Sequence, residues 1–285
     1  RQGYDPAFSS ALSAISGSLG TVIPPSITFI IYGMITGESI SDLFLSGIVP
    51  GLIFGTALCV AVFLQARKHG WKGDTKRGSV KEIWKLFLDT SWGILSPVIV
   101  LGGIYSGLFT PTEAAAVAVI YSMIVGKFIY KELHFTELKD ALFSTASTTG
   151  MILLIIMNAG IFSWVLTQQG IATALTEAAI SMTDNKYIML FVINIVFLIA
   201  GCVMDNTSAL YILVPIVMPI AKALDINMVH LGVILVLNLS IGQVTPPVGP
   251  NLYVAADIGK VKFEDICKKM VPLIIMSLVA LFIVT

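Results

Sequence analysis

Charge is scarce in this chain of 285 residues. Only 12% of its residues are Asp, Glu, Lys or Arg, whereas about 25% are charged in a typical soluble domain. Hydrophobic residues make up 56%, and the mean hydropathy is +0.91. Cysteine is also rare, and the three present are too widely spaced to imply a disulfide framework or a metal site. These shortages argue against a soluble domain and indicate an all-α, multi-pass membrane protein.

The chain also lacks a catalytic arrangement. Its three histidines, His69, His134 and His230, lie at the ends of apolar segments and far from one another in sequence. No nucleophile stands with a base in a recognisable motif, and the formal net charge is zero. We therefore expect neither enzymatic activity nor a nucleic-acid partner.

Long apolar runs fill most of the sequence. A helix needs about 20 apolar residues to span a bilayer. The candidate segments are 7–36, 43–66, 94–109, 112–130, 141–167, 187–204, 207–224, 229–256 and 270–285. A further apolar piece at 170–182 is too short to span alone. Because the chain opens at Arg1 without Met and reaches the first segment at once, we expect further sequence ahead of it.

Basic residues set the expected orientation. The stretch 67–85 holds seven of the seventeen Lys and Arg residues, which predicts a cytoplasmic loop. Residues 78–92 then have an amphipathic pattern, with Trp84 and Trp92 as interfacial anchors. This pattern favours a helix on the membrane surface, and an ordinary linker is the alternative.

Two segments of the chain repeat each other. The run Ser18-Leu-Gly-Thr-Val-Ile-Pro24-Pro25 returns 222 residues later as Ser240-Ile-Gly-Gln-Val-Thr-Pro246-Pro247. The loop at 37–42 that follows the first copy has two acids and no base, whereas the loop at 259–269 has four lysines. Because equivalent loops of opposite charge bias belong on opposite sides, we expect inverted repeats, a hallmark of transporters.

The prolines predict where each helix is interrupted. Proline has no N–H, so the carbonyls of Gly20, Thr21, Gly242 and Gln243 lose their helical partners. A dehydrated Na⁺ is one replacement partner for such carbonyls. The predicted Na⁺ ligands are these four residues with Asp205 and the nearby polar residues Ser16, Ser18, Asn238, Ser240 and Thr245. A plain proline kink, packed by neighbouring helices, is the alternative.

A second polar cluster, Asp205-Asn206-Thr207-Ser208, interrupts the apolar run 187–224. Its lack of Lys and Arg favours the tip of a re-entrant hairpin, although two full crossings also fit. Asp205 is a candidate functional acid, or the cap of a helix that starts at Asn206. The positive N-terminal ends of the half-helices favour an anionic ligand. The candidate substrate residues are therefore Asp205, Asn206, Thr207, Ser208, Pro25, Ser26 and Pro247.

The run Thr110-Pro111-Thr112-Glu113 has the form of a helix start, with a threonine cap and Glu three residues later. Capping explains each of these residues, so we expect a structural role there.

Several runs together resemble one known family. They are Ile23-Pro-Pro-Ser26, Gly107-Leu-Phe-Thr-Pro-Thr-Glu-Ala114, Met204-Asp-Asn-Thr207, and Thr245-Pro-Pro-Val-Gly249 followed by Asn251-Leu252. These motifs are similar to the large membrane subunit of tripartite ATP-independent periplasmic (TRAP) transporters. The resemblance implies Na⁺-coupled uptake of an organic acid, usually a C4-dicarboxylate or a sialic acid, across the bacterial inner membrane. It also implies an elevator mechanism, a periplasmic binding protein that delivers the substrate, and a small four-helix membrane subunit, all in contact with membrane lipid.

The resemblance also implies a division of the chain. We expect a first broken helix at 1–36, scaffold helices at 37–140, connecting helices at 141–186, a hairpin with the second broken helix at 187–256, and a scaffold helix at 257–285. The hairpin equivalent to 187–224 would fall at about −35 to 2, ahead of Arg1. Two alternatives stay open: a Na⁺/carboxylate symporter that needs no binding protein, and an ion channel.

Overall fold

The computed structural model describes residues 4–71 and 79–285, and within them every regular element is helical. This confirms the all-α class. Two compact units can be separated, residues 1–72 with 155–285 and residues 73–154, so the boundary after residue 154 lies inside one long helix. Seven of the described helices are long and apolar enough to cross a membrane.

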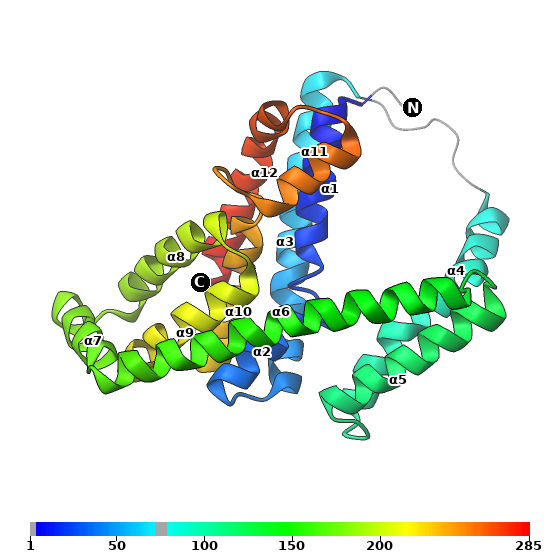
Figure 1. Ribbon diagram of the computed structural model, residues 1–285. Coiled ribbons are helices and arrows are strands. Elements are labelled where there is room, and N and C mark those ends of the chain that lie inside the picture. The colour runs from blue at the N-terminus through cyan, green and yellow to red at the C-terminus, as the bar shows by residue number, and fades with distance from the viewer. Residues whose placement is uncertain (1–3, 72–78) are drawn as a thin grey trace. The chain divides into compact units, whose positions relative to one another are not determined.

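The first unit contains both copies of the repeat (Figure 1). Its helices are α1 (Pro6–Leu19), α2 (Ile27–Thr36), α3 (Ile40–His69), α7 (Ile171–Met182), α8 (Lys186–Val203), α9 (Asn206–Ala223), α10 (Met228–Gly242), α11 (Pro250–Gly259) and α12 (Phe263–Val284). The second unit contains α4 (Val80–Tyr105), α5 (Pro111–Ile124), a π-helical turn (Val125–Ile129) and the start of α6 (Phe135–Gln168).

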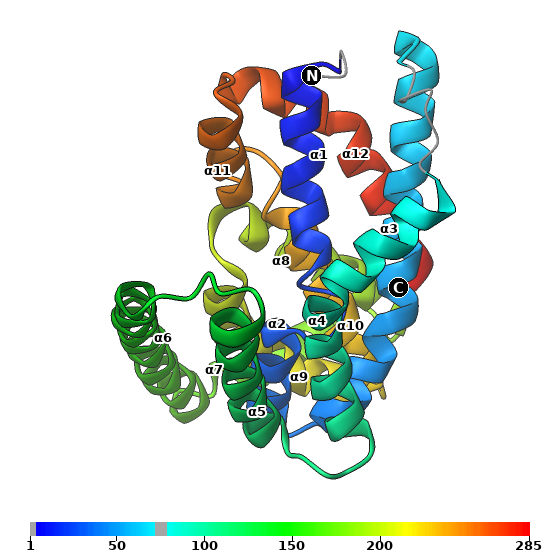
Figure 2. The ribbon, with the colours of Figure 1, turned by 90° about the vertical axis from the view of Figure 1, so that its right-hand side faces the viewer.

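The order and bounds of the helices repeat at the same offset as the sequence. Subtracting 222 places α10 at 6–20 and α11 at 28–37, which are the positions of α1 and α2 to within a residue. The packing repeats as well, because α1 packs against α12 while its counterpart α10 packs against α3. Figure 2 shows α1 between α11 and α12. Each copy is therefore a helix, a break, a short helix and a long helix.

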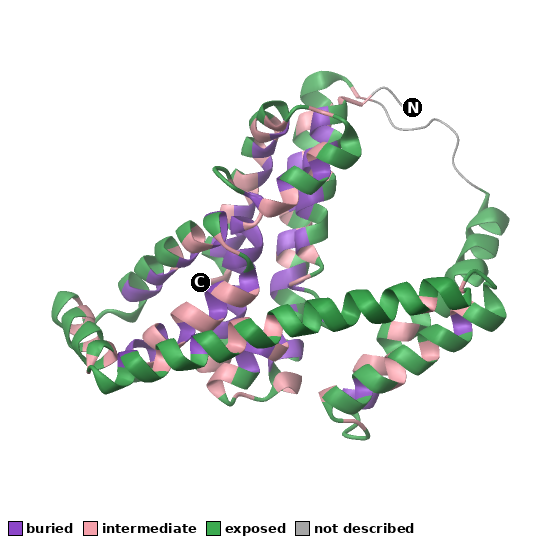
Figure 3. Cartoon of the chain, in the orientation of Figure 1, coloured by how far each residue is buried: buried purple, intermediate pink, exposed green. Residues whose placement is uncertain are grey.

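The core of the first unit runs along α10. Every residue from Leu231 to Gly242 is buried, including the polar Asn238 and Ser240 (Figure 3). A helix that is apolar on all sides belongs in the middle of a bundle, and α10 contacts α3, α8, α9 and α12. The second break therefore begins at the end of the most buried helix.

The connection between α8 and α9 packs closely against that break. A Cβ added to Gly242 would lie 2.6 Å from the Cα of Gly201, so the two backbones touch. The N–H of Gly249 also donates to the carbonyl of Cys202 at 3.3 Å. The absence of side chains at Gly201 and Gly242 is what permits this contact.

The start of α1 is held by a charged contact. Asp5 caps α1 by accepting from the N–H of Ala7 at 2.9 Å, and Lys269 at the start of α12 donates to the same carboxylate at 2.7 Å. The hydrogen bond from Lys269 is the largest cause that lowers the pKa of Asp5 below its usual value. The contact fixes the first turn of α1 against α12.

The first helix of the second unit, α4, is longer than expected. Residues 80–92 and residues 94–105 of the segment expected at 94–109 form one continuous helix, α4, so the amphipathic stretch and the spanning segment are not two separate helices. Gly93 costs about 1 kcal/mol in a helix interior, which is too little to end α4. Position 78 of the expected surface helix lies outside the described residues.

The helix start at Thr110 is confirmed as a capping box. The hydroxyl oxygen of Thr110 accepts from the N–H of Glu113, and the Glu113 carboxylate accepts from the N–H of Thr110 at 2.8 Å. Both groups therefore serve to begin α5.

The glycine contact yields a prediction about stability. Gly242→Ala would force a methyl group into the backbone of Gly201 and should destabilise the fold by about 1–3 kcal/mol. Thermal unfolding of the purified protein in detergent measures this loss. Gly102→Ala in α4 is the matched control, because a Cβ there meets nothing within 4 Å. Equal unfolding midpoints for the two variants would contradict the close contact.

Candidate functional site

The first break lies between α1 and α2. After Leu19 the helix tightens, because the N–H groups of Gly20, Thr21 and Val22 bond to carbonyls three residues back at 3.0–3.1 Å. Pro24 and Pro25, joined by a cis peptide bond, then turn the chain. The new helix begins at Ile27, and the hydroxyl oxygen of Ser26 caps it by accepting from the N–H of Phe29 at 3.3 Å.

The second break, between α10 and α11, has the same form. The N–H of Thr245 bonds to the carbonyl of Gly242 at 2.9 Å, and the bond between Pro246 and Pro247 is also cis. Gly249 adopts a positive φ of 52° immediately before α11 begins at Pro250. Both predicted interruptions are therefore present where the prolines stand.

The four carbonyls lose their helical partners as expected, and three of them accept from another donor in the protein. The Thr21 carbonyl accepts from the hydroxyl of Ser26, and the Gln243 carbonyl accepts from the N–H of Asn251 at 3.2 Å. The Gly242 carbonyl is the acceptor for Thr245 described above. Among the described residues, the carbonyl of Gly20 accepts no hydrogen bond. Tight turns after each break supply these donors locally, and a carbonyl oxygen with one partner keeps a second lone pair.

The two breaks meet each other. The hydroxyl oxygens of Thr21 and Ser240 lie 2.5 Å apart, which joins the first break to the last turn of α10. On the other side of the crossing, the side-chain amide of Asn251 donates to Ser18 Oγ at 3.0 Å and to Gln243 Oε1 at 3.4 Å. At the offset of 222, Ser18 matches Ser240 and Thr21 matches Gln243. The same two positions from each copy therefore build the crossing.

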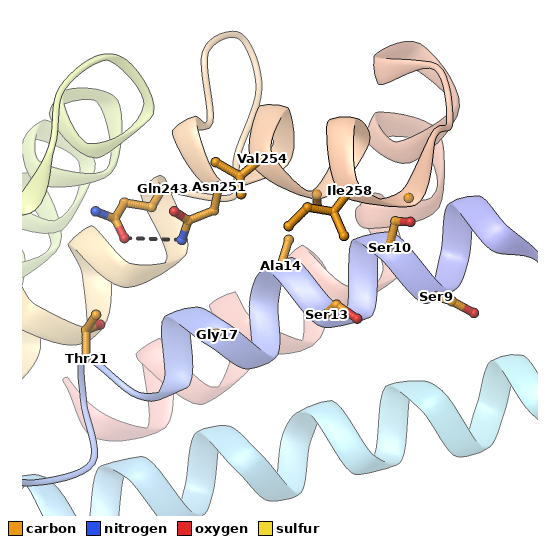
Figure 4. A pocket seen from close by; sticks show the side chains of 12 residues that line it. Ser9, Ser10, Ser13, Ala14, Gly17, Thr21, Gln243, Asn251, Val254 and Ile258 are labelled. Carbon is orange, nitrogen blue, oxygen red and sulfur yellow. Dashed lines mark hydrogen bonds between the residues drawn. The ribbon is translucent and has the colours of Figure 1, made fainter. Parts of the chain in front are cut away.

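A cavity of about 620 Å³ lies beside this crossing, between α1 and α11 (Figure 4). The helices run antiparallel, because Asn251 at the start of α11 meets Ser18 near the end of α1, while Gly259 faces Ser10. Hydroxyl groups from α1 form one wall, apolar residues of α11 form the other, and Thr21, Gln243 and Asn251 lie at one end. The cavity thus offers both polar and apolar contacts to a small molecule.

The predicted ion ligands Ser16, Thr245 and Asn238 form no hydrogen bond across the crossing in the described residues. Ser16 is exposed on α1, and its hydroxyl forms no hydrogen bond with the described residues. Thr245 Oγ1 donates to the Ile241 carbonyl at 2.7 Å. Asn238 is fully buried and donates to the carbonyl and side-chain oxygens of Asn194 at 2.8 and 2.7 Å, so it ties α10 to α8. The side-chain oxygen of Asn238 has no hydrogen-bond partner in the part of the chain that the structure describes.

The cluster at 205–208 forms the connection between α8 and α9. Asp205 caps α9, accepting from the N–H of Ser208 at 3.0 Å and from its hydroxyl at 2.6 Å, which confirms the capping interpretation. The Asp205 side chain is exposed, whereas Asn206 is buried, and its side-chain oxygen has no hydrogen-bond partner within residues 4–71 and 79–285. Thr207 and Ser208 are half-buried. The contact between Gly249 and Cys202 keeps this connection beside the second break.

The candidate substrate residues within the breaks differ in exposure. Pro25 and Pro247 are exposed, while Ser26 is buried with its hydroxyl committed to the Thr21 carbonyl. Ser26 therefore shapes the break, and the two prolines face outward.

Asn251 is absent from the site residues predicted from the sequence, although it belongs to one of the runs that resemble the TRAP family. It stands in the first turn of α11, eight positions after Gln243, and it contacts residues from both breaks. Its signals in the sequence are its place in that run and a polar side chain at the start of a helix that follows two prolines.

Comparisons with known proteins identify the family of the chain. A family model described as "Tripartite ATP-independent periplasmic transporter, DctM component" matches residues 1–285. The isethionate TRAP transporter permease protein DctMQ of Oleidesulfovibrio alaskensis is 40% identical over 284 residues, covering 100% of this chain and 45% of that protein. The C4-dicarboxylate TRAP transporter large permease protein DctM of Pseudomonas aeruginosa is 40% identical over 285 residues, 100% of this chain and 66% of that protein.

A third relative carries a different substrate in its name. The sialic acid TRAP transporter large permease protein SiaM of Vibrio cholerae is 35% identical over 284 residues, 98% of this chain and 66% of that protein. The chain thus spans between about half and two thirds of these relatives. The full-length family match and the helical fold agree with a multi-pass permease of the bacterial inner membrane rather than an enzyme. The chain belongs to the DctM family, the large permease components of TRAP transporters.

Proposed function

We propose that this chain forms part of a Na⁺-coupled secondary transporter that imports an organic acid across the bacterial inner membrane. The observation that carries the proposal is the meeting of two interrupted helices at Thr21 and Ser240, beside a cavity. Interrupted helices that converge inside an apolar bundle supply the polar backbone and side-chain groups that ion-coupled transporters use for binding.

The site favours an anionic substrate. Both α2 and α11 begin directly after a break, and the N-terminal end of a helix carries a partial positive charge. The names of the three relatives refer to isethionate, C4-dicarboxylates and sialic acid, all of them organic acids. We propose that the substrate here is an organic acid of the C4-dicarboxylate or sialic acid type.

Sodium ions are the proposed coupling ions. Hard cations prefer oxygen ligands, and unwound backbone in transporters commonly supplies them. The crossing brings together side-chain oxygens of Thr21, Ser240, Ser18 and Gln243. The carbonyl of Gly20, which accepts no hydrogen bond from the described residues, directly precedes Thr21 in the chain. Asp205 would add a negative charge at the nearby connection between α8 and α9.

We propose that transport follows an elevator mechanism with inverted repeats. The opposite charge bias of the loops at 37–42 and 259–269 supports the inversion. The division expected from the sequence ends the first broken helix at residue 36 and counts α3 among the scaffold helices. However, α3 packs against α10, so that boundary would cut through a packed contact. The packing therefore favours a larger moving body, the part of the protein that the elevator mechanism shifts across the membrane. We therefore assign α3 and α12 to the moving body.

The proposed partners are a small four-helix membrane subunit and a soluble periplasmic binding protein. The permease names of the relatives support this assembly, because each belongs to a TRAP transporter. Membrane lipid would cover the exposed apolar residues of α6, such as Leu153 and Trp164.

Reconstitution tests this function. The full-length permease and its small subunit, in proteoliposomes with the cognate binding protein, should accumulate one acid from a panel of organic acids only under an inward Na⁺ gradient. Uptake that survives replacement of Na⁺ by K⁺ would disprove the ion coupling. Uptake without the binding protein would favour an independent symporter, and a substrate-free ion current would favour a channel.

The cap at Asp205 allows its charge to be tested apart from its structural role. Asp205→Asn should leave the unfolding free energy within about 0.5 kcal/mol of the wild type, because Asn caps helices as well as Asp. The lost charge should lower Na⁺-driven uptake by roughly tenfold, which corresponds to about 1.4 kcal/mol.

Two further variants complete that comparison. Asp205→Ala should lose about 1 kcal/mol of stability as well, because it removes the cap. Asp42→Asn, at an exposed acid in the first turn of α3, should transport like the wild type. Normal uptake by Asp205→Asn would leave Asp205 with its structural role alone.

A further inference from the structure

We propose that Asn251 is a positioning residue that couples the two helix breaks, so that an ion bound at one break changes the affinity at the other. The inference rests on the proposed Na⁺ coupling and deepens it by naming the connection between the two copies. It concerns a residue that lies outside the predicted ligand set.

The contacts of Asn251 reach both breaks at once. Its side-chain nitrogen has two hydrogens and two acceptors, Ser18 Oγ at 3.0 Å and Gln243 Oε1 at 3.4 Å. Its backbone N–H donates to the Gln243 carbonyl at 3.2 Å. Figure 4 shows the amide of Asn251 directed toward Gln243 at the end of the cavity. One side chain thus holds the last turn of α1 and the residue that follows α10.

The internal repeat shows why this bridge is special. Applying the offset of 222 to the pair Thr21 and Ser240 gives Gln243 and Ser18 as the equivalent pair. The first pair is in direct contact, whereas the second is joined through Asn251. The copies therefore connect to each other in two chemically different ways.

The residue equivalent to Asn251 in the first copy cannot form such a bridge. It is Phe29, a fully buried ring in α2. The first copy therefore has no polar side chain at this position that could take over the role of the Asn251 amide. Loss of the Asn251 amide would therefore leave the contact between Thr21 and Ser240 as the one polar side-chain link between the breaks in the described residues.

The surroundings of Ser18 fix the direction of its hydrogen bond with Asn251. Ser18 is fully buried, and its hydroxyl donates to the Ala14 carbonyl at 3.4 Å, so its oxygen is free to accept from Asn251. An ion that draws the oxygen of Gln243 or Ser18 toward itself would pull on the same amide. Energetic coupling between two sites is reciprocal, so each break would sense the other.

Sodium titration of thermal stability tests the inference without a known substrate. The full-length permease with its small subunit is unfolded by heat at increasing NaCl, with choline chloride keeping the ionic strength constant. Asn251→Ala should need roughly tenfold more Na⁺ than the wild type for the half-maximal shift, as expected from the loss of two hydrogen bonds. Asn251→Leu, which keeps the branched shape of the side chain but removes its amide, should behave in the same way.

Asn227→Ala is the matched control. Asn227 carries the same amide but caps the opposite end of α10, where its side chain accepts from the N–H of His230 at 3.0 Å. This variant should lower the unfolding midpoint at every Na⁺ concentration and leave the half-maximal concentration unchanged. The Hill coefficient for Na⁺ in uptake should fall toward 1 in the Asn251 variants and stay at the wild-type value in Asn227→Ala.

The outcomes separate this inference from the proposed function. Asn251 variants that fold and keep the wild-type half-maximal Na⁺ concentration and Hill coefficient would overturn the inference alone. A wild-type protein that shows no Na⁺-dependent shift would overturn the sodium coupling and the inference together.

Discussion

The first unit depends on one constraint: polar backbone groups freed by interrupting a helix within an apolar bundle must find partners inside the protein. Both breaks meet it with tight turns and donors from the following residues, and the first break adds the Ser26 cap. Only the Gly20 carbonyl among the four freed by the prolines accepts no bond from the described residues. The other three carbonyls are therefore held in place by donors within the protein itself.

Close backbone contact brings these breaks together with the rest of the unit. The buried α10 carries the second break into the core, and Gly242 lets Gly201 approach to backbone contact. Serine and threonine hydroxyls then join the copies, with Thr21 against Ser240 and Ser18 against the amide of Asn251. Small side chains are favoured at such helix crossings because they permit short distances and hydrogen bonds between helices.

Much of this arrangement could be predicted from particular residues. The paired prolines located both breaks, and the offset of 222 anticipated matching helix bounds. Thr110 was recognised as a cap, and a cap was one of the two roles predicted for Asp205, because capping depends on local sequence. The carbonyl partners and the bridge at Asn251 could not be predicted, since they depend on how distant segments fold back. The continuity of α4 was missed because amphipathic and spanning patterns were treated as separate helices.

The central claim is that the two breaks meet, and a crosslink tests it most directly. In a full-length variant whose three native cysteines within this chain, and any elsewhere, are replaced by serine, Thr21→Cys and Ser240→Cys place two thiols where the hydroxyl oxygens lie 2.5 Å apart. Mild oxidation in the membrane should join them, while the pair Ser13→Cys and Ser240→Cys, set two turns further along α1, should stay reduced. Free thiols at 21 and 240 after oxidation, with the control pair equally unreacted, would contradict the meeting of the breaks.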